Sequence, residues 1–326
     1  MMQLALGSLV APIEAGFGHV WSVCELGLAL TRLDELRGDP YRDALLRDIE
    51  TRGFHPPLDT VEPLASARSG YVGTRNPYRR LAPHGEERVL AWLQKGEPGP
   101  CKTLLLVCHC YGVPVPGVMQ GLFGLRRAPV DVAYNILPHH QRGTFSLWPG
   151  SGFARVRISS FIENLRSAVT GMRALLRGLT LGGQYERVVV LGFSLGGQVA
   201  LHVATAEALD SLILYCPVTS LRDTALELGL MRSFAPPLRR GLRLLGRDDV
   251  FDDLKVTEPL QYGLRTPEEH VHVVVQRHDA LAPPRQTEAI RRRHGGVRWG
   301  RRRHRDVPAS DASTLGFALP PCGGGW

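Results

Sequence analysis

Cysteine is scarce in this chain, and its spacing matches no familiar metal or redox motif. The six cysteines are scattered, and Cys108 and Cys110 are separated by one residue, whereas a CxxC motif requires two. A zinc-finger framework and a thioredoxin-like dithiol are therefore excluded. Scattered cysteines in a chain of this length are typical of reduced thiols, so we expect a cytoplasmic protein.

The chain also lacks an apolar run long enough to span a membrane. Its first thirty residues are fairly apolar, but Glu14, His19 and Glu25 interrupt them, and a spanning helix needs about 20 consecutive apolar residues. The segment has neither the basic start nor the small-residue cleavage site of a secretory signal. We expect it to pack against the fold or to form cap material. A helix that lies on a membrane surface is the alternative.

Lysine is nearly absent, since only three of the 39 basic residues are lysines. The net charge of +8 is concentrated in residues 291–305, RRRHGGVRWGRRRHR, which hold eight arginines and no acidic residue. Without this segment the chain is close to neutral. A nucleic-acid-binding surface spreads positive charge over one face and interleaves aromatic side chains. We therefore expect no nucleic-acid partner.

Short apolar runs alternate with helical patterns from residue 103 onward. Apolar residues form 44% of the chain and charged residues 21%, the balance of a soluble globular protein. Within Phe161–Leu179 the apolar residues step by three and four, as on one face of a helix, and Leu195–Ala206 is a second helical stretch. Continuous apolar strands alternating with helices predict an α/β fold, with a mostly parallel sheet covered by helices on both faces. The five predicted strands are Thr103–Cys108, Pro129–Leu137, Arg187–Leu191, Leu212–Cys216 and His270–Val275.

The remaining segments suggest the domain boundaries. About fifty residues separate the fourth and fifth strands, which is too long for a plain crossover and indicates an inserted helical cap. This insertion includes the helix-like stretch Leu221–Leu230 and the apolar and basic stretch Leu238–Leu245. Near the start, Asp39–Glu50 is predicted to be helical, His55–Pro83 a loop, and Glu86–Gln94 a strand or a short helix. The predicted parts are an N-terminal helical and loop region with possible first strands (1–100), a core (101–218 and 269–290), a cap (219–268) and a disordered basic tail (291–326).

The segment Gly192–Gly197, GFSLGG, is the feature that most directly indicates chemistry. It follows the strand RVVVL and precedes a helix. Gly192 and Gly196 allow a sharp turn to close, and a turn of this kind holds Ser194 in a strained, exposed conformation. The helix that follows offers N–H groups to a developing negative charge. An incidental glycine-rich turn is the alternative, but the position between strand and helix favours a nucleophilic serine.

The stretch from Thr103 to Pro284 resembles the α/β-hydrolase superfamily of esterases, lipases and peptidase-like enzymes. Four landmarks occur in the order of that superfamily: a strand ending in HCYG, a strand ending in LPHH, the GFSLGG turn and a late strand ending in RHDALAPP. The resemblance implies that Ser194 is the nucleophile and that the backbone N–H groups of Tyr111 and Leu195 form the oxyanion hole. Cys110 stands where the superfamily usually has glycine. No metal and no organic cofactor are implied.

The same resemblance indicates Asp279 as the catalytic acid, because it follows the fifth predicted strand and precedes a proline-containing turn. It would accept a hydrogen bond from the imidazole and fix its tautomer. A role as a helix or turn cap is the alternative. Asp210 is a weaker candidate because it precedes its strand, and Asp252 and Asp253 fall within the predicted cap.

The histidine base is harder to place. The superfamily sets it after the last strand, and only His294 and His304 follow Asp279. Spacing favours His304, whereas the neighbouring glycines favour His294. Residues 295–299 make a poor strand, and both histidines could also be solvated members of a basic tail. We attribute the abrupt change in composition after residue 290 either to a disordered basic tail or to a reading-frame change that replaced the original end, and composition favours the second.

Taken together, the sequence predicts a serine hydrolase that cleaves a small-molecule or lipid-like ester through an acyl-enzyme. The predicted catalytic residues are Ser194, Asp279 and His304. Two alternatives stay open: a hydrolase-like protein that binds without catalysis, and an acyltransferase built on the same scaffold.

Overall fold

The structure is a computed structural model of the 326-residue chain. It describes residues 39–58, 61–64, 68–81, 88–96, 102–111, 129–140, 153, 157–227, 250–276 and 284–302.

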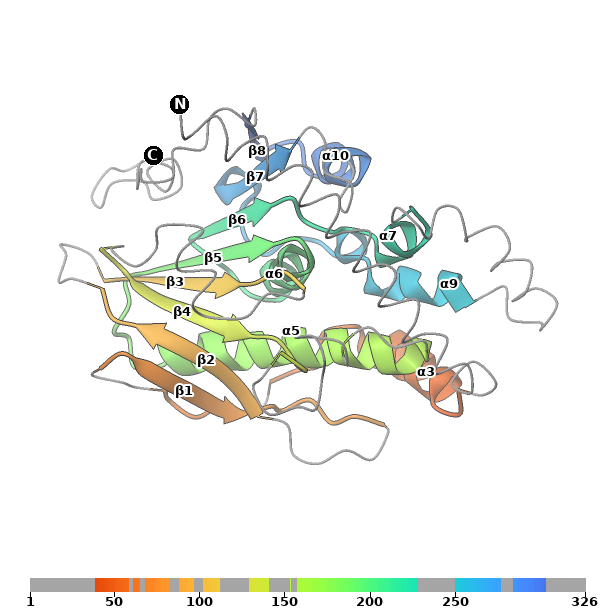
Figure 1. Cartoon of the computed structure of the whole chain (residues 1–326), viewed down its shortest axis with the longest axis horizontal. Helices are drawn as coiled ribbons and strands as arrows, with labels where there is room; N and C mark the ends of the chain where they lie inside the picture. Colours follow the sequence, from red (N-terminus) through yellow and green to blue (C-terminus); the bar gives the residue numbers. More distant parts are fainter. Residues whose placement is uncertain are drawn as a thin grey trace, which may run out of the picture.

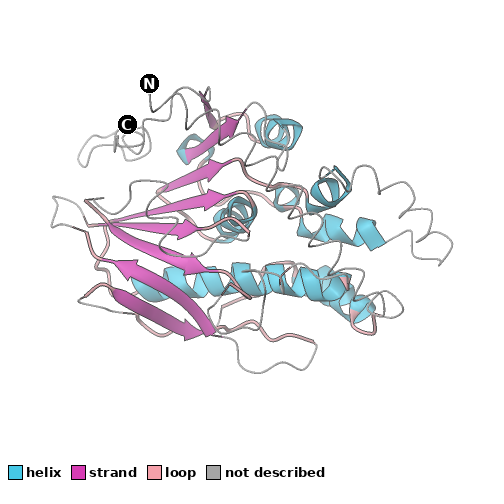
Figure 2. Cartoon of the chain, in the orientation of Figure 1, coloured by secondary structure: helices cyan, strands magenta, loops and turns pink. Residues whose placement is uncertain are grey.

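One eight-stranded sheet organises the described residues (Figures 1 and 2), in the order β1-β2-β4-β3-β5-β6-β7-β8. β2 is antiparallel to β1 and β4, and every other neighbouring pair is parallel. The carboxyl ends of β3 through β8 therefore all lie at the same end of the strands, which is called the carboxyl edge of the sheet. The strands are β1 (Gly70–Arg75), β2 (Arg88–Gln94), β3 (Thr103–Cys108), β4 (Asp131–Ile136), β5 (Arg187–Phe193), β6 (Ser211–Tyr215), β7 (Val271–Gln276) and β8 (Arg298–Arg302).

The helices pack on this sheet, and the predicted α/β class with a mostly parallel sheet is confirmed. The long helix α5 contacts β1, β2 and α6, and α6 contacts β3, β5 and β6. The described helices are α3 (Arg42–Arg52), α5 (Ile158–Thr180), α6 (Leu195–Ala206), α7 (Leu221–Glu227), α9 (Val250–Asp253) and α10 (Pro284–Arg293), with 3₁₀ turns η2 (Leu254–Thr257), η3 (Pro259–Gln261) and η4 (Glu268–His270).

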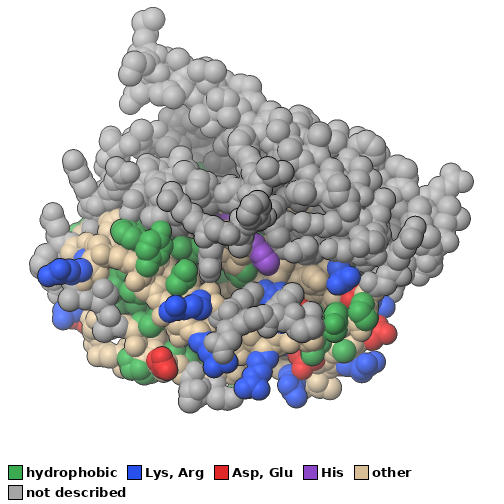
Figure 3. Space-filling model, turned by 60° about the horizontal axis from the view of Figure 1, so that its bottom comes forward, with side chains coloured by type: hydrophobic (Ala, Val, Ile, Leu, Met, Phe, Trp, Pro, Cys, Tyr) green, Lys and Arg blue, Asp and Glu red, His purple; other side chains and the backbone are tan. Residues whose placement is uncertain are grey.

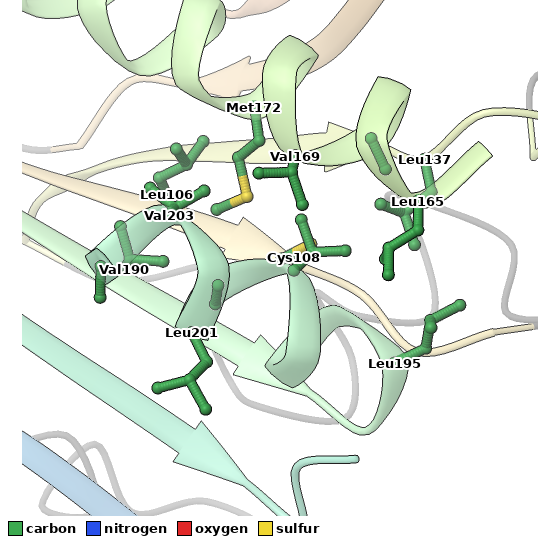
Figure 4. Close-up of a cluster of buried hydrophobic side chains, with 14 of the residues drawn as sticks. Leu106, Cys108, Leu137, Leu165, Val169, Met172, Val190, Leu195, Leu201 and Val203 are labelled. Atoms are coloured by element: carbon green, nitrogen blue, oxygen red, sulfur yellow. The ribbon is translucent and has the colours of Figure 1, made fainter. Parts of the chain in front are cut away.

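Both faces of the central strands are buried, which explains their continuous apolar sequence. Along β3, Leu104, Leu106 and Cys108 belong to one core cluster, whereas the alternate residues Leu105 and Val107 belong to a second. The first cluster lies between the sheet and helices α5 and α6 (Figure 4). It also contains buried residues of α3 and α10.

The first hundred residues contribute more to the fold than a loop region would. Within the predicted loop His55–Pro83, the structure forms strand β1, so that prediction is wrong there. β1 contains two glycines and is only partly buried, because it pairs with β2 alone, and it therefore lacks an apolar strand pattern. The ambiguous segment Glu86–Gln94 forms a strand, β2.

The surface around β1 and β2 is mixed in character. Tyr71 is 60% exposed, and its ring meets that of Trp92 edge to face, with centroids 4.9 Å apart. On the side of the molecule shown in Figure 3, the Lys and Arg side chains of the described residues are scattered among acidic and apolar ones.

The predicted cap, residues 219–268, has two described parts. Helices α7 and α9 lie beyond the arrowheads of β5 and β6 (Figure 1). Residues 254–266 then run alongside α6, where the N–H of Arg265 donates to the carbonyl of Ala204 at 2.9 Å. This second part belongs to the packed core. The apolar and basic stretch Leu238–Leu245 lies outside the described residues.

The predicted end of the core at residue 290 is wrong. Helix α10 continues to Arg293, and β8 then pairs with β7 in parallel. β8 occupies the edge of the sheet, so it needs a partner on one side only and tolerates three arginines in a pattern that does not resemble a buried strand. Val297, just before it, is 5% exposed and joins the main core. The tail prediction for residues 303–326 lies outside the described residues.

No helix among the described residues is long and apolar enough to cross a membrane.

Candidate active site

Ser194 occupies the turn between β5 and α6 in a conformation that few non-glycine residues adopt. Its φ is 49° and its ψ is −114°. Such a backbone costs about 1–3 kcal/mol and persists only where its surroundings impose it. Here the N–H of Ser194 donates to the carbonyl of Tyr215 at 3.0 Å, and the N–H of Val218 donates to the carbonyl of Ser194 at 3.1 Å. The loop after β6 therefore holds the serine in place.

The glycines around Ser194 are required by close backbone approach. A Cβ on Gly196 would lie 2.3 Å from the carbonyl oxygens of both Cys108 and His109. One on Gly192 would lie 2.6 Å from the carbonyl oxygen of Gly196, and one on Gly197 would lie 2.8 Å from Cβ of Pro217. The sequence motif thus reflects three separate contacts. The contact at Gly196 also brings the loop after β3 against the first turn of α6.

We expect Gly196→Ala to damage both stability and the serine site. The added methyl group meets two backbone carbonyls, which cannot rotate away as a side chain can, so the free energy of unfolding should fall by about 1–3 kcal/mol or more. Urea denaturation measures this loss. Gly263→Ala is the matched control, because nothing lies within 4 Å of a Cβ at Gly263. Equal stability of the two variants would contradict the close approach at Gly196.

His109 holds the loop after β3. It is fully buried, and its Nδ1 lies 2.7 Å from the carbonyl oxygen of Cys110, while its Nε2 lies 3.1 Å from the backbone nitrogen of Leu137. Since a carbonyl only accepts and an N–H only donates, His109 carries its proton on Nδ1 and is neutral. Burial, followed by the nearby His140, lowers its pKa to about 3. His109 therefore orients the HCYG loop. The sequence motif contains this residue, but its partner Leu137 comes from another segment, directly after β4.

The two predicted oxyanion donors come from neighbouring segments at the carboxyl edge of the sheet. Leu195 is the first residue of α6, where backbone N–H groups have no partner within the helix. Tyr111 follows β3, whose last residue, Cys108, is paired with Gly192 of β5. The Tyr111 ring meets His140 at a centroid distance of 5.5 Å and Phe153 at 6.4 Å. The loop after β3 is thus packed in an aromatic environment beside the serine turn.

His294 lies at the opposite edge of the sheet and cannot serve as the base for Ser194. It directly follows α10 and is 5% exposed, and its Nδ1 lies 2.9 Å from a carboxylate oxygen of Glu268. Glu268 precedes the start of β7, whereas Ser194 follows the end of the parallel strand β5. A strand of six residues separates these edges by about 20 Å. Of the two histidine candidates, the structure leaves His304.

The weaker acid candidates have other partners. Asp210 accepts a hydrogen bond from the N–H of Val188 at 2.7 Å, at the amino ends of β5 and β6. Asp253 forms a bidentate pair with Arg42 at 2.5 and 2.8 Å. Asp252 pairs with Arg222 and Lys255, both at 3.2 Å. Asp279 and His304 themselves lie outside the described residues.

The fold is that of a known family of hydrolases. The model of the alpha/beta hydrolase family matches residues 105–312, and the chain belongs to this family. No curated protein matches the chain.

Several solved structures are similar in fold. An acetyl xylan esterase from Paenibacillus sp. R4 is 14% identical, with a TM-score of 0.49, and the match covers 86% of this chain and 91% of that one. An acylaminoacyl peptidase from Pyrococcus horikoshii is 15% identical, with a TM-score of 0.47 and coverage of 73% of this chain. This chain spans 37% of the length of that peptidase.

Proposed function

We propose that the protein is a serine hydrolase that cleaves an ester or related acyl bond through an acyl-enzyme at Ser194. The observation that carries the proposal is the conformation of Ser194, with φ of 49° at the junction of β5 and α6. A strained, half-buried serine at the start of a helix is suited to nucleophilic attack and poorly suited to a purely structural role.

In the proposed mechanism, the Oγ of Ser194 attacks the substrate carbonyl while His304 accepts the hydroxyl proton. Asp279 accepts a hydrogen bond from the imidazole, and the N–H groups of Tyr111 and Leu195 stabilise the oxyanion. The alcohol leaves with the proton from His304. Water, activated by the same histidine, then releases the acid and restores the serine.

The strand order supports the assignment of Asp279 and His304. β7 ends at Gln276, three residues before Asp279, and β8 ends at Arg302, two residues before His304. Both strands are parallel to β5, so their carboxyl ends lie at the edge where Ser194 lies. Short connections from neighbouring strands can bring the three side chains together.

A fluorophosphonate probe tests the proposal directly, because it reacts with activated serines and spares ordinary ones. We expect one covalent adduct, located at Ser194 by mass spectrometry of the digested protein. A panel of p-nitrophenyl esters of increasing chain length then tests the proposed small-molecule or lipid-like substrate. An unlabelled protein would favour a non-catalytic binding protein. Transfer of the acyl group to an added alcohol in preference to water would favour an acyltransferase.

Asp279→Asn is expected to lower kcat by about 10²–10⁴-fold, because an amide cannot hold the imidazole in the productive tautomer. Thermal stability should change little. Steady-state hydrolysis of a p-nitrophenyl ester measures the effect. Asp210→Asn is the matched control, since Asp210 lies at the amino ends of the strands. A loss of rate in the control, with Asp279→Asn unaffected, would assign the acid elsewhere.

A further inference from the structure

A single backbone carbonyl anchors the helix that follows the nucleophile. The Nε2 groups of Gln198 and His202 both donate to the carbonyl oxygen of Thr257, each at 2.9 Å. The two donors are four residues apart and therefore lie on the same face of α6. All three residues are fully buried. α6 starts immediately after Ser194, and the carbonyl of Thr257 attaches this helix to the segment that follows α9.

The hydrogen bonds determine where the protons lie. A carbonyl only accepts, so His202 carries a proton on Nε2 and, when neutral, has a lone pair on Nδ1. That Nδ1 lies 2.9 Å from Nε2 of His55, which must donate to it. The Oγ of Thr205 lies 3.2 Å from the same His55 nitrogen and donates its own hydrogen to the carbonyl of His202, so it too accepts from His55.

The surroundings keep both rings neutral. Burial lowers the pKa of His202 to about 3, and burial together with the charges of Arg173 and Arg166 lowers the pKa of His55 to about 4. A further proton on His202 would place two N–H groups against each other. Among the described residues, the other charged or titratable groups around the pair are Asp48, which binds Arg166, Glu207, which binds Arg173, and Tyr262, whose ring lies 4.9 Å from that of His55.

His55 belongs to a segment that precedes the region matched by the family model. The neighbouring Phe54 is fully buried and stacks on the His202 ring at a centroid distance of 4.4 Å. Arg166 of α5 donates to the carbonyls of Gly53 and Phe54, and Arg173 donates to that of Pro56. The segment is therefore fixed to α5 at the point where it contacts α6.

We propose that His202 and His55 are positioning residues of the hydrolase site. His55 fixes the tautomer of His202, and His202, with Gln198, fixes the rotation and position of α6 against Thr257. Through α6 these contacts set the placement of Ser194 and of the Leu195 N–H. The role in catalysis rests on the proposed function, whereas the arrangement of the rings can be measured independently of it.

His202→Phe tests the positioning role, because it keeps an aromatic ring against Phe54 and removes both hydrogen bonds. We expect kcat for p-nitrophenyl acetate, and the rate of fluorophosphonate labelling, to fall about tenfold while KM stays unchanged. His202→Gln can place an amide N–H near the position of Nε2 and should restore the rate to within about twofold of the parent.

His294→Phe is the control for general destabilisation, because it replaces a buried histidine at the opposite edge of the sheet and should leave kcat unchanged. A parent-like kcat in His202→Phe would overturn the positioning role while leaving the proposed function intact. A reduced kcat that His202→Gln does not restore would also overturn it, because loss of the hydrogen bond to Thr257 would then not account for the effect.

Nitrogen-15 NMR of the parent protein tests the ring arrangement without relying on the folding of a variant. At pH 5 we expect both His55 and His202 to be neutral and protonated on Nε2. A doubly protonated His202, or one protonated on Nδ1 alone, would overturn the proposal. If the parent fails to react with the fluorophosphonate, the proposed function fails, and the NMR result still decides the hydrogen-bond arrangement.

Discussion

Ser194→Ala is expected to reduce ester hydrolysis by at least about 10⁴-fold and to abolish fluorophosphonate labelling. The reason is that no other group in the proposed mechanism can form the acyl-enzyme. The fold should stay intact, because the hydrogen bonds that fix residue 194 come from its backbone N–H and carbonyl groups, which alanine keeps. Steady-state kinetics and intact-protein mass spectrometry measure the two losses.

Ser220→Ala is a suitable control for that experiment. Ser220 follows β6 at the same edge of the sheet, but its hydroxyl donates to Glu258 at 2.9 Å and accepts from the N–H of Asp223 at 3.1 Å. We expect Ser220→Ala to retain labelling at Ser194. Undiminished hydrolysis by Ser194→Ala would show that the nucleophile lies elsewhere.

His304→Ala has the second largest expected effect, a fall of about 10⁴-fold in kcat, because the serine loses the base that accepts its proton. β8 ends two residues before His304, at the carboxyl ends of the parallel strands, where Ser194 lies. The rate of hydrolysis of a p-nitrophenyl ester measures this effect. A thermal unfolding transition like that of the parent shows that the variant is folded at the assay temperature.

His294→Ala is the matched comparison, because the two histidines are ten residues apart and lie on either side of β8 in the sequence. Removing the His294 imidazole leaves a buried cavity and a carboxylate of Glu268 without one partner. It should therefore lower the free energy of unfolding by about 1–3 kcal/mol and leave kcat unchanged. A large loss of kcat in His294→Ala, with His304→Ala active, would reverse the assignment.

The central part of the fold could be predicted from the sequence because its signals are local. β3, β5, β6 and β7 are short apolar runs between helices, and a parallel sheet buried on both faces produces that pattern directly. α6 was predicted with the same bounds as in the structure, Leu195–Ala206. The two outermost strands of the sheet could not be predicted in this way. β1 and β8 lie at the two edges of the sheet, where one-sided pairing stabilises sequences with little apolar character.

The sequence by itself determined the strand–Ser194–helix turn, because glycines at 192, 196 and 197 next to an apolar strand specify that local geometry. Only the tertiary structure excluded His294, since its hydrogen bond to Glu268 places it at the amino ends of the strands. It likewise joined His55 to His202 across 147 residues of sequence. Contacts between distant segments depend on strand order and helix packing, and no local pattern of residues encodes them.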